Sequence, residues 1–208
     1  TLDFTADPAP VPGADALWSW DEENKTLTLK DGFALYNDDP DLGDLILLPD
    51  DATVVVEGSA TVYNAGYRSI ASEGSLTIRG AGAETANLEI VGGDCAIYAD
   101  DDVIVTGSTV SASGGDVVIY SYDGGVRIEN STITAAPYYM LIGASGDVDI
   151  VDSNVSFTGA EIGIIADGTV TLDGGSFTGT FYTGGIGAEK IVLTGEPTLD
   201  LTGLDSDS

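Results

Sequence analysis

Acidic side chains return at one position of a repeating pattern, and carboxylates gathered in this way can bind metal. The set comprises Glu73, Asp100, Asp101, Asp102, Asp123, Asp147, Asp167 and Glu189. Oxygen ligands without histidine or cysteine favour hard cations such as Ca²⁺. The best candidate ligands are Asp100, Asp101 and Asp102, together with Asp123. The sequence thus predicts Ca²⁺ as a cofactor here. The alternative is ordinary turn chemistry, in which Asp faces water.

Tyrosines lie close to these carboxylates in the repeat and could bind a ligand through their rings. The candidates are Tyr98, Tyr120, Tyr122, Tyr138 and Tyr139. Tyr98 and Tyr120 occupy the same outward-facing position of consecutive repeats. Exposed rings beside carboxylates and a cation are typical of a carbohydrate-binding surface, since an aromatic ring offers an apolar face with a polar end. The alternative is cross-strand stacking that only stabilises a sheet.

The elements that must position these residues form a repeat of fixed length. Its first isoleucines are Ile97, Ile119, Ile142, Ile164 and Ile186, which lie 22, 23, 22 and 22 residues apart. Self-similarity in this range is typical of a solenoid. Each unit holds three short stretches of period-2 alternation, such as Val103–Val105, which indicates strands and not helices. We therefore predict an all-β, right-handed, single-stranded parallel β-helix of about 22 residues per coil and roughly eight coils. The alternative is an antiparallel sandwich.

Equivalent positions of the repeat predict stacked columns of side chains. One inward column starts at Ile70 and continues through the five isoleucines, and a second contains Val105, Ile128, Ile150 and Leu172. At each corner stands a residue type that tolerates a left-handed backbone. This corner column is Asp31, Gly58, Gly80, Gly107, Asn130, Asp152, Gly174 and Gly195.

The chain divides into three parts. Residues 1–16 contain Pro8, Pro10 and Pro12, and we interpret them as an extended lead-in. We predict the β-helix over residues 17–201 and a frayed tail over residues 202–208. Longer coils place surface loops near residues 36–44 and 80–85. Trp18 and Trp20 are expected to cap the N-terminal end of the solenoid, with a sugar-stacking platform as the alternative.

Composition limits the partners. The chain of 208 residues has 6 basic against 35 acidic residues, no histidine and a net charge of −29. Nucleic acid and anionic membrane surfaces would be repelled. No apolar run is long enough to span a bilayer. The single cysteine, Cys95, excludes an intrachain disulfide and is expected to be buried.

Enzymatic function is the minority interpretation. The lack of histidine excludes every mechanism that requires one. A polysaccharide lyase would need a basic residue near the acidic turn, and Arg127 and Lys190 are the candidates. A hydrolase would need two carboxylates, a requirement that 35 acidic residues meet too easily to be informative.

The repeat style resembles a known group of proteins. Trp18-Ser-Trp20-Asp, followed by units such as "AIYADDDVIVTGSTVSASG" and "GIIADGTVTLDGGSFTG", is similar to exported parallel β-helix modules of Firmicutes-type bacteria, among them clostridial carbohydrate-binding β-helix proteins. The resemblance covers residues 18 to 201. It implies a right-handed parallel β-helix and, for some members, calcium-dependent binding of acidic polysaccharides.

Together, these patterns predict a non-enzymatic module, extracellular or on a bacterial cell surface, that binds glycans or mediates adhesion with Ca²⁺. Its expected partner is a polysaccharide or a host-surface glycan. The alternatives are a rigid spacer or adhesin stalk without a ligand of its own, and a polysaccharide lyase acting on acidic sugars.

Overall fold

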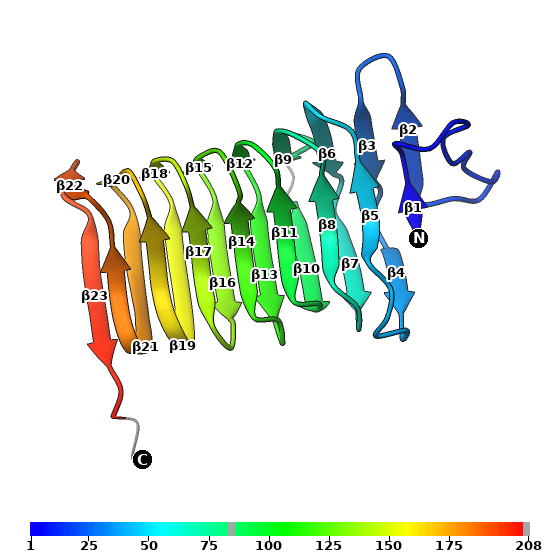
Figure 1. Cartoon of the computed structure of the whole chain (residues 1–208). Helices are drawn as coiled ribbons and strands as arrows, with labels where there is room; N and C mark the ends of the chain where they lie inside the picture. The colour runs from blue at the N-terminus through cyan, green and yellow to red at the C-terminus, as the bar shows by residue number, and fades with distance from the viewer. Residues whose placement is uncertain (83–85, 206–208) are drawn as a thin grey trace.

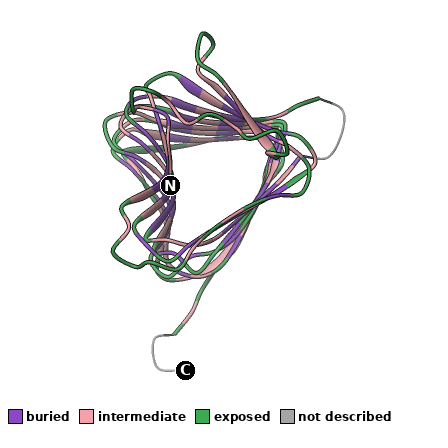
Figure 2. Ribbon diagram, turned by 90° about the vertical axis from the view of Figure 1, so that its right-hand side faces the viewer, coloured by how far each residue is buried: buried purple, intermediate pink, exposed green. Residues whose placement is uncertain are grey.

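The computed structural model describes residues 1–82 and 86–205, which wind into a three-sided parallel β-helix (Figure 1). Seen along its axis, the chain traces a triangular outline, and buried residues lie along each of the three walls (Figure 2). The described residues contain strands and no helix. The predicted fold class is therefore confirmed, and the sandwich is excluded because the coils pair in parallel.

Each coil contributes one strand to each of three faces. The first face consists of β5 (Asp44–Leu48), β8 (Arg68–Ser72), β11 (Cys95–Ala99), β14 (Val117–Ser121) and β17 (Met140–Ala144). The second face consists of β3 (Thr26–Leu29), β6 (Ala52–Val56), β9 (Leu76–Gly80), β12 (Val103–Thr106), β15 (Val126–Glu129), β18 (Val148–Val151), β20 (Thr169–Asp173) and β22 (Lys190–Thr194). The third face consists of β4 (Phe33–Asn37), β7 (Ser59–Asn64), β10 (Asn87–Gly92), β13 (Thr109–Ser113), β16 (Thr132–Ala136) and β23 (Thr198–Gly203).

Two long strands join the third face to the first. β19 (Asn154–Ala166) and β21 (Ser176–Gly187) run through the corner without a break, so these two faces form a single 14-stranded sheet. The second face is a separate sheet of nine strands. The eight strands from β3 to β22 on this face give the coil count that the repeat predicted.

The pairing register confirms the predicted columns. Ile97 pairs with Ile70 on one side and Ile119 on the other, and Val105 pairs with Ile78 and Ile128. All six side chains are fully buried. Since a single coil cannot cover its own apolar residues, the core exists only because neighbouring coils stack.

The corner column is confirmed at six of its eight positions. Gly58, Gly107, Asn130, Asp152, Gly174 and Gly195 all have positive φ angles. In the first coil the left-handed residue is Gly32 and not Asp31, whose side chain instead accepts a hydrogen bond from the Ser59 amide. Gly80 ends β9 without a positive φ. A Cβ at Gly80 would lie 2.4 Å from the Gly107 carbonyl oxygen, so close approach of two coils explains this glycine.

Residues 2–4, at the start of the predicted lead-in of residues 1–16, pack onto the first coil of the solenoid. β1 (Leu2–Asp3) pairs in parallel with β5, and the buried Phe4 lies against both tryptophans of β2 (Trp18–Asp21). The Phe4 ring centroid is 5.5 Å from that of Trp18 and 4.6 Å from that of Trp20. β2 pairs antiparallel with β3, so a hairpin and three rings cover this end of the core, as expected for capping. The sequence missed this arrangement because a two-residue strand has no periodicity.

At the C-terminal end of the solenoid, the last described coil exposes aliphatic side chains. Ile191, Leu193 and Leu199 of the last described coil are each about half exposed. β23 continues to Gly203, two residues beyond the predicted boundary at residue 201. Residues 206–208 of the predicted tail, and residues 83–85 of the predicted 80–85 loop, lie outside the described residues.

Candidate functional site

A groove of about 510 Å³ crosses the first face and brings most of the predicted tyrosines together. Its lining residues are Tyr67, Asp94, Cys95, Tyr98, Asp116, Val117, Tyr120, Tyr122 and Tyr139. This volume is within the range of sites that bind small ligands. Tyr138, the fifth predicted tyrosine, does not line the groove and is 71% exposed.

Three polar groove residues, Tyr67, Asp94 and Asp116, were not predicted as site residues, and all three share one repeat position. Arg68, Cys95, Val117 and Met140 stand in register at the start of the first-face strands. The residues immediately before them are therefore equivalent, and in chain order they are Tyr67, Asp94, Asp116 and Tyr139. A search for columns of a single residue type overlooks this column, because it contains both tyrosine and aspartate. The column consists of the residue that directly precedes each first-face strand, and this position could have been identified from the repeat.

Two stacked rings form the centre of the groove. Tyr98 pairs with Tyr120, and their ring centroids lie 6.1 Å apart at an interplanar angle of 21°. The guanidinium of Arg68 lies 4.2 Å from the centroid of the Tyr98 ring. Such a contact adds cation–π attraction to the ring stack. The centre of the groove is therefore a packed and ordered surface.

Charged partners fix this arrangement from both sides. Arg68 donates two hydrogen bonds to Asp44, one of them 2.8 Å long between Nη2 and Oδ2. Burial opposes the charge on Arg68, but these hydrogen bonds and the charge of Asp44 raise its pKa overall. The Tyr98 hydroxyl donates to Asp100 at 2.8 Å. Burial, and then this hydrogen bond, raise the pKa of Tyr98 well above its usual range, so the hydroxyl stays protonated.

The four predicted calcium ligands do not converge on one point. Asp100 accepts the Tyr98 hydroxyl, and Asp102 accepts the Gly125 amide at 2.7 Å. Asp101 and Asp123 are exposed. Within residues 1–82 and 86–205, no group of three or more acidic, cysteine or histidine side chains is arranged to hold a metal ion.

Several aspartates of the turns hold neighbouring coils together. The Asp50 carboxylate accepts the Ser75 amide at 2.9 Å, and that of Asp147 accepts the Thr169 amide at 2.6 Å. Asp102 makes the equivalent bond to Gly125. Each bond satisfies a backbone N–H that the sheet ladder leaves unpaired at the corner. Asp102 and Asp147 of the acidic repeat therefore have a structural role.

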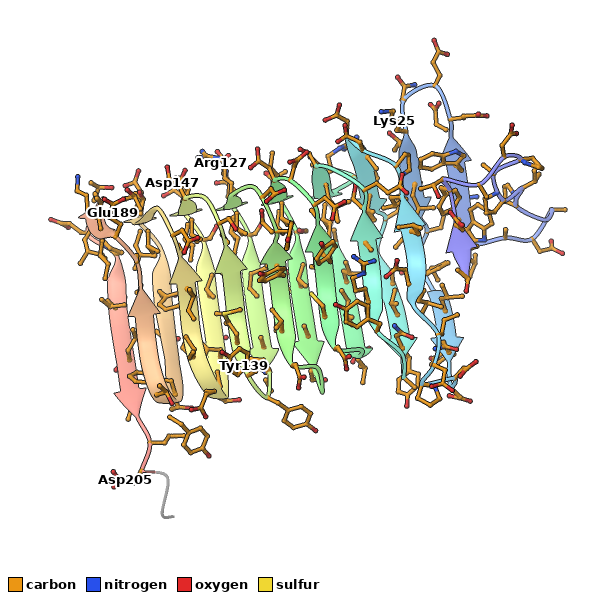
Figure 3. The ribbon with its side chains drawn as sticks, in the orientation of Figure 1. Lys25, Arg127, Tyr139, Asp147, Glu189 and Asp205 are labelled. Atoms are coloured by element: carbon orange, nitrogen blue, oxygen red, sulfur yellow. The ribbon has the colours of Figure 1, made fainter. Side chains whose placement is uncertain are left out.

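The acidic turns follow the ends of the first-face strands and form one long edge of the solenoid, whereas the two aspartates of the tyrosine groove lie before the starts of these strands. Arg127, Asp147 and Glu189 follow one long edge, whereas Tyr139 lies towards the opposite edge (Figure 3). A hollow of about 430 Å³ at the acidic edge is lined in part by Arg127, Asp147 and Asp149. Arg127 forms ion pairs of 3.2 Å with Glu129 and 3.6 Å with Asp149.

Comparisons with protein-family models, with curated proteins and with solved structures found no match to this chain. A search of the described residues for a helix long and apolar enough to cross a membrane also found none.

Proposed function

We propose that the protein is a non-enzymatic carbohydrate-binding module displayed outside a bacterial cell, and that the tyrosine groove is its binding site. The observation that carries this proposal is the convergence of five tyrosines and two aspartates on one open groove. Tyrosine rings stack on the apolar faces of sugars, and their hydroxyls bond to sugar hydroxyls. Carboxylates accept hydrogen bonds from the same sugar hydroxyls.

The construction of the groove favours binding of an extended chain. Tyr98 and Tyr120 stand on strands of consecutive coils, and strands hold side chains more precisely than loops do. The other three tyrosines and the two aspartates lie in the bends directly next to the first-face strands. Tyr67, Tyr122 and Tyr139 are each about half exposed, so their rings remain accessible. A polysaccharide lying across the coils would meet a new ring at each coil.

The test combines a glycan array with calorimetric titration of any glycan that binds. We expect Tyr122→Ala and Tyr139→Ala each to weaken binding about tenfold, the effect of losing one stacked ring. Tyr36→Ala is the matched control, because Tyr36 is 66% exposed on β4 of the third face. Failure of every glycan to bind, or an equal loss in the Tyr36 variant, would overturn the proposal.

A rigid spacer is the second candidate function. It is supported by the continuous core and by the aspartate bonds between coils, which make the solenoid a stiff rod. A spacer would bind no glycan at any concentration tested, and Tyr122→Ala would leave adhesion by the full-length protein unchanged.

A further inference from the structure

The column of residues before the first-face strands contains both tyrosine rings and carboxylates. Their order indicates which charge the ligand carries. The order of the column is Tyr67, Asp94, Asp116 and Tyr139. Backbone hydrogen bonds hold these residues in consecutive coils, from Cys95 to Tyr67 at 3.1 Å, from Val117 to Asp94 at 2.9 Å and from Tyr139 to Asp116 at 3.0 Å. Two aspartates thus lie side by side between two tyrosines.

We infer that this groove selects glycans that contain free amino sugars, whose ammonium group it binds between the two aspartates and the tyrosine rings. The inference rests on the proposed function and specifies its ligand class. Ammonium groups are attracted to aromatic faces and to carboxylates, and this column offers both.

The charges of the groove support a cationic ligand. Asp94 and Asp116 are exposed, and within the described residues neither carboxylate has a hydrogen bond or an ion pair. Adjacent coils are about 4.8 Å apart, so the two charges repel each other. Arg68, the cation beside the groove, is already paired with Asp44. A ligand with positive charge would relieve the repulsion, whereas a uronic acid would increase it.

Other cations fit this column less well. The column supplies two carboxylates with rings on either side, and rings are poor ligands for Ca²⁺, which takes six to eight oxygens. The Tyr98–Tyr120 ring stack lies next to the column, within the same groove. One sugar unit is about as long as the distance between coils, so successive units would meet successive coils.

The test compares glucosamine oligomers with their N-acetylated counterparts of equal length by calorimetric titration. At about pH 6 and about 50 mM salt, we expect the free amine form to bind about tenfold more tightly. This preference should shrink as salt rises, because the charges are exposed. Asp94→Asn with Asp116→Asn should remove the preference, so that the double variant binds the free amine and the acetylated oligomer with affinities within about twofold of each other. Asp123→Asn, an exposed aspartate outside the groove lining, is the control.

Each of the other outcomes is decisive. Equal affinity for both oligomers, or tighter binding of a galacturonate oligomer, would overturn the inference while leaving a glycan-binding groove. Equally tight binding of an oligolysine peptide would overturn the assignment to sugars. Failure of every oligomer to bind would instead overturn the proposed function itself.

Discussion

Cys95 lines the groove, but its thiol is buried and is expected to react slowly. Burial raises the pKa of its thiol from an ordinary value of 9.0 to about 12. Because the thiolate is the nucleophile, we expect the native protein to react with iodoacetamide at least about a hundredfold more slowly than the unfolded protein. Mass spectrometry of timed samples at constant pH measures both rates. A native rate close to the unfolded rate would contradict the burial of this thiol.

The same pKa predicts a pH dependence of stability. Below pH 9.0 the thiol is neutral in both states, and its contribution to stability is fully present. Above that pH only the unfolded chain ionises, so stability is lost at about 1.4 kcal/mol per pH unit until the folded pKa of about 12 is reached. Denaturant unfolding between these limits should show a steeper loss in the wild type than in Cys95→Ala. Parallel curves would count against the prediction.

Single residues were predicted well where the repeat gives them identical neighbours. Tyr98 and Tyr120 were found by spacing alone, because parallel register places them side by side. Asp94 and Asp116 were missed because the column around them changes residue type from coil to coil. Which carboxylates accept backbone amides, and which remain unpaired, depends on corner geometry that spacing does not encode.

At the scale of the turn, Asp102 stabilises the junction between two coils. Its carboxylate accepts the Gly125 amide at 2.7 Å. Asp102→Ala should lower the free energy of unfolding by about 1 kcal/mol, since the amide loses its acceptor. Asp102→Asn keeps an oxygen in place and should retain most of the stability. Urea unfolding measures the differences.

Asp123→Ala provides the matched control for this turn. Asp123 is exposed in the equivalent region of the next coil, and its replacement should change stability by less than about 0.5 kcal/mol. An equal loss in the Asp102 and Asp123 variants would mean that general charge, and not the hydrogen bond, is responsible.

A strand on the first face shows how stacking distributes the core energy. Ile119 of β14 is fully buried between Ile97 and Ile142, so Ile119→Ala should cost about 2–5 kcal/mol. Ile191 of β22 is 48% exposed, and Ile191→Ala should cost less than about 1 kcal/mol. Thermal or urea unfolding of both variants tests the gradient. Similar losses would contradict a core built by neighbouring coils.

Elements were predicted accurately where alternation repeats and poorly where it does not. The three strands per coil follow from the apolar periodicity, as do the six left-handed corners. The first strand, with Phe4 packed on the tryptophans, has no repeat to reveal it. The predicted calcium cluster assumed that stacked aspartates face one another. In the structure, Asp102 turns towards a backbone amide and Asp100 towards a tyrosine.

At the scale of the whole molecule, charge opposes folding. A net charge of −29 on a chain of 208 residues repels itself in the compact state. Added NaCl screens this repulsion, so the thermal midpoint should rise between about 10 mM and about 500 mM salt. If the midpoint stayed constant over this range, the surface charges would have to be compensated already.

The thermal midpoint also tests whether the folded chain binds Ca²⁺. At matched ionic strength, CaCl₂ should raise the thermal midpoint above the value in NaCl or MgCl₂ only if a site binds Ca²⁺ in the folded chain, as proposed for Asp100, Asp101, Asp102 and Asp123. Asp101→Asn with Asp123→Asn tests this site cleanly, because these two exposed side chains leave the Asp102 bond to Gly125 intact. If CaCl₂ gives this extra stabilisation, the double variant should lose it while keeping the response to NaCl. Identical midpoints in CaCl₂ and MgCl₂ would instead assign the acidic turns to holding the coils together and to charge alone.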